Sequence, residues 1–380
     1  LPFRARNANM PIYLDNNATT ELDAGVLDAM QPWLMGAFGN PSSVHRYGRL
    51  ARGAIDAARQ QVANLVGVSP KQIVFTSGGT EANNLALKGV LAASATQRII
   101  VSPTEHPCVV EPAERLQQQG VQVDWLKVDK TGQVCMRSLE GLLQQPAALL
   151  SVMRANNETG ALQDIFAITA LATQQGVPVH CDAVQAAGKV PLSFAELNVQ
   201  LMSLSAHKIY GPKGVGALVF DSALDIHSMQ QGGGQEHALR AGTENVAGIV
   251  GFGAAAELAI AELEPRQKLL SGLMQVLDAG LKNNPAIHIF ADGAERLNNT
   301  RQFALAGWEG EALLMELDRR GIAVSSGSAC HSGTGEPSHV LLAMGIERDL
   351  AYGAIRVSLG KNNTEADVAT LLAALQELAR

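Results

Sequence analysis

The sequence predicts an α/β protein with a large domain, built on a mostly parallel, mixed sheet of about seven strands covered by helices, and a smaller α+β C-terminal domain. Three observations predict it. Apolar runs alternate with amphipathic stretches from about residue 53 to 220, which is typical of a parallel sheet between helices. Near residue 260 a long helical segment replaces this pattern. A chain of 380 residues is also longer than a domain with a single hydrophobic core usually is. We therefore expect domains at 15–260 and 261–380, with residues 10–14 packed on the second.

The strands of the large sheet are expected at apolar runs bounded by turn residues. The last two are separated only by the turn around "IYGPKG", which is too short for a crossover, so we expect one antiparallel edge. The runs are 73–76, 98–102, 121–126, 148–153, 177–182, 201–205 and 215–220.

Helices are expected between these strands, for example at 108–119 and 164–175, and in the second domain at 262–281. The last helix is predicted from "TEADVATLLAALQELAR", where Thr364 and Asp367 form a capping pair. Its apolar face comprises Val368, Leu371, Leu372, Leu375 and Leu378.

Composition excludes several classes of protein. A net charge of −7 argues against nucleic acid or an anionic membrane as the main partner, and no apolar stretch has membrane-spanning length. The nine residues before Met10 carry no pattern, so we treat them as leader residues. The four cysteines are too few for a disulfide framework, and His180 and Cys181 point to opposite faces of a strand, so no metal site is expected. A reducing cytoplasm is the expected location.

Three motifs carry chemistry. In "IVFTSGGTEANN" a strand runs through Gly78 and Gly79 into a helix, which suits either a phosphate site or an ordinary turn. Asp182 ends a strand, where it could receive a ring N–H⁺ or cap a helix. Lys208 follows the next strand and could form a Schiff base, whereas its rival Lys213 lies in an exposed Pro/Gly turn. The ordered combination favours a pyridoxal-phosphate site.

A fourth motif is "VSSGSACHSG", residues 324–333, which places Cys330 among small, flexible residues. Such flanks suit a thiol that must move, since Gly/Ser segments are flexible.

Together these residues resemble the cysteine desulfurases, fold-type-I pyridoxal-phosphate enzymes of the class V aminotransferase group. The "SGSAC" form is similar to that of the housekeeping and nitrogen-fixation branch, and differs from that of the selenocysteine lyases. The resemblance runs from Ile12 through nearly the whole chain. Its motifs are "YLDNNATT", "GNPSSVH", "TSGGTEANN", "TEHPCV", "NNETG", "HCDAVQ", "SAHKIYGPKG", "GGGQE", "RAGTEN" and "SSGSAC".

The resemblance implies a role for each site residue. Lys208 would form the Schiff base, His106 would stack on the ring and move protons, and Asp182 would pair with the ring nitrogen. Arg356 would bind the substrate carboxylate with Asn157, and Thr243 would reach the phosphate of a neighbouring subunit in a homodimer. The remaining cofactor ligands would be Asn157 and Gln185 at the phenolate oxygen, and Gly79, Thr80, Ser205 and His207 at the phosphate.

The resemblance also implies the reaction. L-cysteine would become L-alanine, and its sulfur would pass to Cys330 as a persulfide and then to an acceptor protein for iron–sulfur clusters or other sulfur-containing products. The chain departs from the family where "RSGT" reads "RAGT" and where no tail follows Arg380. The second departure favours a nitrogen-fixation-type or specialised acceptor. The alternatives are a selenocysteine lyase, another class V aminotransferase, or a non-catalytic protein that keeps the fold.

Overall fold

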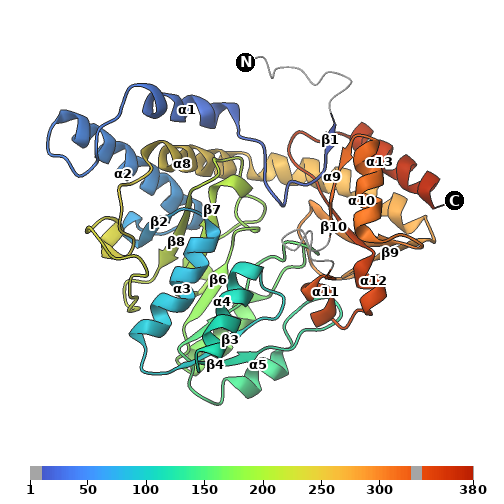
Figure 1. Cartoon of the computed structure of the whole chain (residues 1–380), viewed down its shortest axis with the longest axis horizontal. Helices are drawn as coiled ribbons and strands as arrows, with labels where there is room; N and C mark the ends of the chain where they lie inside the picture. The colour runs from blue at the N-terminus through green and yellow to red at the C-terminus, as the bar shows by residue number, and fades with distance from the viewer. Residues whose placement is uncertain (1–10, 327–335, 380) are drawn as a thin grey trace.

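The computed structural model describes residues 11–326 and 336–379. Figure 1 shows a large sheet with its helices on one side of the molecule and the C-terminal elements gathered on the other. Cys330, which the sequence predicts to be catalytic, lies outside the described residues.

The large sheet has seven strands in the order β2-β8-β7-β6-β5-β3-β4, and it confirms the predicted fold class. Every predicted apolar run contains one of its strands, and every neighbouring pair from β7 to β4 is parallel. In chain order the strands are β2 Ile73–Thr76, β3 Arg98–Val101, β4 Gln122–Trp125, β5 Leu149–Ser151, β6 Val179–Asp182, β7 Leu201–Ser205 and β8 Gly216–Phe220.

The prediction that the antiparallel strand lies at the edge of the sheet is wrong in one respect. Strand β8 is antiparallel to β7, as the short turn requires, but it lies second in the sheet and not at its edge. Strand β2 pairs with the outer side of β8, also antiparallel, and forms the edge instead. The cause is long-range: the donors and acceptors on the outer side of β8 are satisfied by the strand that comes first in the sequence.

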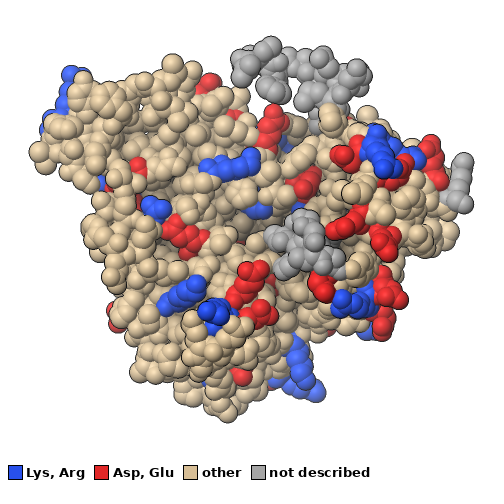
Figure 2. Space-filling view, in the orientation of Figure 1, with Lys and Arg blue, Asp and Glu red and all other residues tan. Residues whose placement is uncertain are grey.

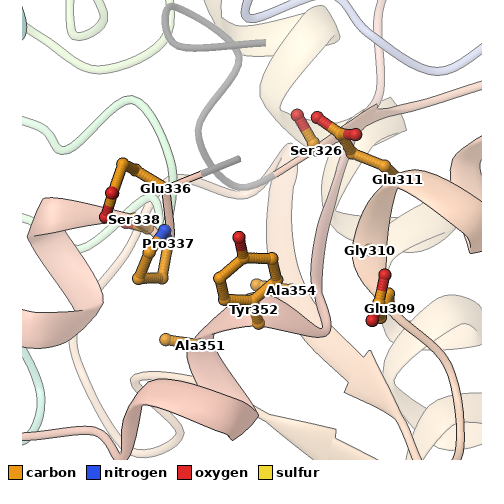
Figure 3. A pocket seen from close by; sticks show the side chains of 10 residues that line it. All are labelled: Glu309, Gly310, Glu311, Ser326, Glu336, Pro337, Ser338, Ala351, Tyr352 and Ala354. Carbon is orange, nitrogen blue, oxygen red and sulfur yellow. The ribbon is translucent and has the colours of Figure 1, made fainter. Parts of the chain in front are cut away.

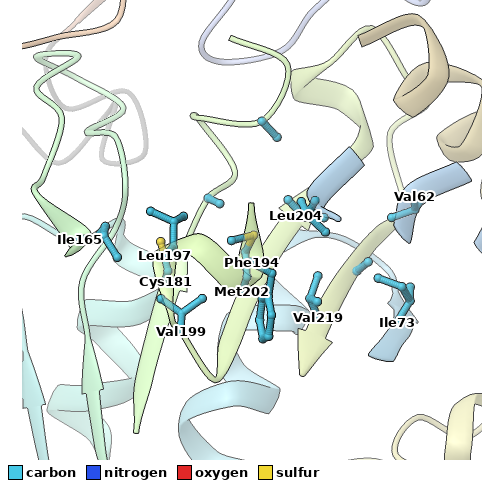
Figure 4. Packing of buried hydrophobic residues seen from close by; sticks show 14 of the residues in the cluster. Val62, Ile73, Ile165, Cys181, Phe194, Leu197, Val199, Met202, Leu204 and Val219 are labelled. Atoms are coloured by element: carbon cyan, nitrogen blue, oxygen red, sulfur yellow. The ribbon is translucent and has the colours of Figure 1, made fainter. Parts of the chain in front are cut away.

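Helices cover both faces of the sheet. Alternate side chains of each strand enter two apolar clusters: Phe75 and Met202 enter one, packed against α2 and α8, while Val74 and Leu201 enter the other, packed against α3 and α4. Figure 4 shows the first of these clusters. The helices of this part are α1 Ala24–Met35, α2 Arg46–Val66, α3 Gly79–Ala93, α4 Pro107–Gln118, α5 Met136–Leu142, α6 Ile165–Gln174, α7 Phe194–Leu197 and α8 Val246–Ala261.

The C-terminal elements form a second sheet, ordered β12-β13-β10-β9 and antiparallel throughout. Near the other end of the chain, β1 Ile12–Tyr13 pairs in parallel with β11 Ile322–Ala323. The other elements are α9 Leu263–Lys282, β9 Ile287–Ile289, β10 Thr300–Leu305, α10 Gly310–Arg319, β12 Ser325–Ser326, α11 His339–Ala343, α12 Arg348–Tyr352, β13 Ala354–Ser358 and α13 Glu365–Leu378.

The final helix forms as its sequence predicts. The Thr364 side chain accepts from the Asp367 N–H, and the Asp367 side chain accepts from the Thr364 N–H, so the capping box is confirmed. The predicted apolar face packs into the core of the second sheet: Val368, Leu371 and Leu375 are fully buried, and Leu372 and Leu378 are partly buried against it.

The charges are mixed on the face shown in Figure 2, where acidic and basic side chains are interspersed with wide uncharged areas. Within residues 11–326 and 336–379, no single helix has both the length and the hydropathy of a membrane span. The bent pair α8 and α9 meets these criteria only when the two helices are taken together, by length and composition.

Candidate active site

A cavity of about 310 Å³ lies where β6 and β7 end and α3 begins. This is the edge at which open α/β sheets bind their ligands. The structure brings most of the predicted site residues to this cavity. They are Gly79, Thr80, His106, Asn157, Asp182, Gln185, Ser205, His207, Lys208 and Arg356.

A second cavity, shown in Figure 3, is much smaller, at about 40 Å³. Tyr352, Glu336 and Ser338 are among its lining residues, and none of the lining residues within 11–326 and 336–379 is a predicted catalytic or cofactor-binding group. We therefore assign the site to the cavity at the end of β6 and β7, where titratable side chains from several elements converge.

The N-terminus of α3 forms the part of the cavity suited to a phosphate. A Cβ atom at position 79 would lie 2.8 Å from Val184 Cγ2, so this close approach requires a glycine. The buried Ser205 hydroxyl has no hydrogen-bond partner among the described residues. His207 is held neutral, because burial and then Lys208 and Lys213 lower its pKa to about 4. Free helix N–H groups and an unsatisfied hydroxyl fit an anionic phosphate.

Asp182 occupies the end of β6, and no helix begins after it, so it is not a helix N-cap. One carboxylate oxygen accepts from the Val184 N–H at 2.9 Å, and the other from Asn83 Nδ2 at 2.7 Å. Burial raises the pKa of Asp182. A buried carboxylate with these contacts is suited to a cationic ring N–H of a ligand.

Lys208 closes the short 3-10 turn Ala206–Lys208 that follows β7, and its side chain reaches the cavity. Nζ donates to the main-chain oxygens of Asn17, at 2.5 Å, and of Ala18, at 2.8 Å. The rival Lys213 is exposed, as the Pro/Gly turn predicts. The amine that enters the site is therefore that of Lys208.

His106 caps helix α4 from the cavity side. Its Nδ1 accepts from the Cys108 N–H at 3.1 Å and lies 2.9 Å from Cys108 Sγ. Since Nδ1 accepts this bond, the proton of the neutral ring belongs on Nε2. Burial and the charge of Asp182 raise the pKa of Cys108 to about 12, so this thiol is protonated and is no nucleophile at neutral pH.

Arg356 reaches the cavity from β13, in the C-terminal sheet. It is buried, with Nη2 2.6 Å from Asp15 Oδ1 and Nη1 donating to the Asn157 main-chain oxygen at 3.0 Å. Arg356 is therefore a buried ion-pair partner and not a surface residue. Arg356 Nε and Asn157 Oδ1 are buried polar atoms without partners among the described residues. Both fit contacts to a bound ligand.

The structure adds Asn17, Asn83 and Cys108 to the predicted site. All three lie in motifs that carried the resemblance, "YLDNNATT", "TSGGTEANN" and "TEHPCV". The second and third motifs gave roles to other residues, Gly79, Thr80 and His106, and the first motif gave a role to none. Asn17 is the furthest from the others in sequence, and its place beside Lys208 depends on the path of the N-terminal segment across the site.

Among the described residues, one predicted site residue is not brought to the cavity. Thr243 is exposed, next to Glu244, which pairs with Arg52 of α2 at 2.8 Å. Cys330 lies outside the described residues. No group of three or more His, Cys, Asp or Glu side chains in the described ranges could hold a metal ion.

Comparisons with known proteins agree with this geometry. The aminotransferase class-V family profile matches residues 12–371. The cysteine desulfurase IscS of Dictyoglomus turgidum is 43% identical, over 97% of this chain and 94% of that protein. The human cysteine desulfurase is also 43% identical, over 94% of this chain and 79% of that protein.

Solved structures give the same result. A NifS-like protein superposes with a TM-score of 0.91 at 39% identity, covering 97% of this chain and 99% of that one. A structure of SspA in complex with cysteine superposes with a TM-score of 0.81 at 32% identity, covering 92% and 98%. The fold and the cavity thus define a pyridoxal-phosphate enzyme of the class V aminotransferases. Within that class, the chain belongs to the cysteine desulfurase family.

Proposed function

We propose that the protein is a pyridoxal-phosphate-dependent cysteine desulfurase. It converts L-cysteine to L-alanine and passes the sulfur, as a persulfide on Cys330, to an acceptor protein that serves iron–sulfur cluster assembly or another sulfur-containing product. The observation that carries the proposal is the convergence of Lys208, Asp182 and Arg356 on one cavity in a chain that matches cysteine desulfurases over nearly its whole length.

The chain's own residues hold the cofactor. Lys208 provides the amine for covalent attachment, and Asp182 accepts from the ring nitrogen. When bound, the cofactor supplies an electron sink for negative charge at the substrate Cα. Its remaining contacts are Gln185 and Asn157 at the phenolate oxygen, and Gly79, Thr80, Ser205 and His207 at the phosphate. The unpartnered Ser205 hydroxyl, which can donate to a phosphate oxygen, supports this arrangement.

The substrate is oriented by Arg356 and Asn157. A guanidinium group binds a carboxylate through parallel N–H bonds, and the buried Nε of Arg356 is available for one of them. His106, which lines the same cavity, stacks on the ring and moves a proton through Nε2. These contacts direct the substrate's Cα toward Lys208 and His106.

Sulfur transfer is assigned to Cys330 by the motif "SSGSAC". Its thiolate attacks the substrate sulfur; an S–S bond forms as the substrate's C–S bond breaks, and the carbon product is protonated to alanine. We place Cys330 in a small domain of residues 261–380, with residues 10–14 packed on it, and the cofactor residues in a large domain of residues 15–260.

The protein is further proposed to act as a homodimer with shared sites. Apolar side chains around the α1–α2 connection are exposed, among them Phe38 by 83% and Val44 by 87%. The pair between Arg52 and Glu244 joins α2 to the segment that carries Thr243. A second copy seated on this apolar surface would therefore meet Thr243, which fits contact with the partner's phosphate.

A cytoplasmic location is proposed with this function. Cys108, Cys135 and Cys181 are free thiols, as expected in a reducing compartment, and persulfide chemistry also needs reduced thiols.

The test is incubation with L-cysteine and measurement of alanine, sulfide and protein persulfide by mass spectrometry. We expect Cys330→Ala to bind the cofactor and change its absorbance with L-cysteine, yet to lose alanine and sulfide release. Cys135→Ala, which removes a thiol outside the cavity, is the matched control and should behave as wild type. Wild-type turnover by Cys330→Ala would favour a selenocysteine lyase, and transfer to a keto acid would favour an aminotransferase.

A further inference from the structure

Lys189 is a buried lysine that the proposed mechanism does not use. It lies in the turn region after β6, and only 8% of it is exposed. Its Nζ donates to Gln185 Oε1 at 2.6 Å and to Asn17 Oδ1 at 3.1 Å. No carboxylate within residues 11–326 and 336–379 forms an ion pair with it. A buried ammonium group without an acidic partner is costly, so its position calls for an explanation.

The groups around Lys189 are mainly cationic. Burial, and then the positive charges of Lys208 and Arg356, lower the pKa of Lys189 well below its usual range. Arg266 and Tyr210 border a cavity of about 20 Å³ that also touches both lysines. Asp15 forms an ion pair with Arg356 and not with Lys189. A bound anion would oppose this lowering of the pKa and favour the ammonium form of Lys189.

Lys189 also helps to determine how two amides are oriented, and at Asn17 it does so together with Asn299, whose Nδ2 donates to Asn17 Oδ1 at 3.1 Å. An ammonium group can only donate, so both contacts must be made by the amide oxygens of Gln185 and Asn17. The Gln185 NH₂ group is then turned to the Asn17 main-chain oxygen, at 2.9 Å, and toward the cavity. The Asn17 NH₂ group is likewise turned to the Asn157 main-chain oxygen, at 3.1 Å. Asn17 is shared, because its main-chain oxygen also accepts from Lys208.

We propose that Lys189 is a positioning residue of the cofactor site: it fixes the amides of Gln185 and Asn17 and places a positive charge behind them, facing the anionic part of the bound cofactor. The inference rests on the proposed roles of Lys208 and Gln185. It explains the buried charge without an acidic partner, since the ligand supplies the missing anion.

The test measures absorbance, not turnover. The visible spectrum of the bound cofactor is titrated with pH in wild type, Lys189→Met and Lys189→Gln. A positive charge favours the deprotonated, more negative form of the cofactor, so its removal should raise the midpoint by about one pH unit in both variants. Lys71→Met, which removes an exposed lysine charge far from the cavity, should keep the wild-type midpoint.

Cofactor affinity gives a second readout: we expect both Lys189 variants to bind pyridoxal phosphate about tenfold more weakly than Lys71→Met. A wild-type midpoint and affinity in either Lys189 variant would overturn the inference. Circular dichroism establishes that each variant is folded. If Lys189→Met fails to fold, Lys189→Gln carries the test, because its amide can still donate to one of the two oxygens.

A separate experiment tests the proposed function. Borohydride reduction and peptide mapping of the wild-type protein locate the lysine that carries the cofactor. Attachment to a lysine other than Lys208 would refute the proposed function. Attachment to Lys208 in all proteins, combined with unchanged midpoints, would refute only the role of Lys189.

Discussion

At the scale of single residues, burial is the main cause of the shifted pKa values in this site. Asp182 and His207 are each displaced from their ordinary pKa, and for both the first cause is removal from water. Lys208 is instead defined by its hydrogen bonds to the main chain of Asn17 and Ala18. The cavity therefore holds its titratable groups in fixed positions with few compensating ion pairs.

Lys208 is predicted to carry the cofactor. Borohydride reduction should fix the cofactor on the peptide that contains Lys208, since its amine reaches the cavity whereas the side chain of Lys213 is exposed. Peptide mapping by mass spectrometry reads the result. Lys208→Ala should lose the label and Lys213→Ala should keep it; a label on Lys213 would refute the assignment.

His180 makes a prediction for stability against pH. Its ring lies between the hydroxyls of Ser151 and Ser203, at 2.9 and 3.0 Å, and burial lowers its pKa to about 3. The unfolded chain binds a proton near pH 6.5 and the folded chain does not, so this contribution to stability is lost as pH falls from about 6.5 toward 3. By pH 5 the loss of this contribution should lower the free energy of unfolding by about 2 kcal/mol.

Urea denaturation of the cofactor-free protein at pH 7.5 and pH 5 measures this loss. His180→Gln should lose about 2 kcal/mol less than wild type between the two pH values. His227→Gln, which changes an exposed histidine, should lose as much as wild type. Equal losses in all three proteins would contradict a neutral His180.

At the scale of elements, one acidic side chain joins α2 to the edge strand of the large sheet. Glu236 accepts from Arg59 through both carboxylate oxygens, at 2.6 and 2.7 Å, and also from the Phe75 N–H at 2.8 Å. Arg59 in turn donates to the Ile73 main-chain oxygen and lies over the Phe75 ring. These contacts hold β2 at the outer side of β8, and they help to place the start of α3 at the cavity.

Breaking this buried pair is predicted to be costly. Glu236→Gln leaves the Arg59 charge buried without its partner, so the free energy of unfolding should fall by about 3 kcal/mol, measured by urea denaturation. Glu377→Gln breaks an exposed pair with Arg320, 2.7 Å apart, and should cost far less, because solvent screens the pair. Similar losses in the two variants would contradict a stabilising role for the Glu236 contacts.

At the scale of the whole molecule, the two sheets lie side by side and the site draws on both (Figure 1). Arg356 comes from β13, whereas Lys208 and Asp182 follow strands of the large sheet. The α1–α2 connection, with its exposed Phe38 and Val44, lies at the opposite end of the molecule from the C-terminal sheet. A dimer formed through that end would leave the C-terminal elements accessible to an acceptor protein.

If the protein forms a dimer through the exposed apolar surface at Phe38 and Val44, charged side chains there should disrupt the dimer. Phe38→Asp combined with Val44→Asp should convert a dimer into a monomer, because two carboxylates cannot be buried in an apolar interface. Light scattering after size-exclusion chromatography measures the mass. Met315→Asp, at an exposed apolar position on α10, should leave the dimer intact. A wild-type protein that is monomeric and fully active would refute shared sites.

The strands of the large sheet, the capping of the last helix and the order of the site motifs could be predicted from the amino-acid sequence. These features depend on neighbouring residues: a strand buried on both faces needs a continuous apolar run, and a capping box needs Thr364 three positions before Asp367. The resemblance also rests on short motifs, so Lys208 and Asp182 could be predicted as site residues from the sequence.

Three further features could be seen only in the folded chain: the position of β8 inside the sheet, the approach of Asn17 to Lys208, and the burial of Arg356 and Lys189. Among the described residues, Lys189 is buried against two amides and no acid. Each depends on pairing between segments far apart in the chain. A lysine that lies in solvent and one that is enclosed by two amides look the same in a sequence, because burial is a property of what the rest of the fold places around the side chain.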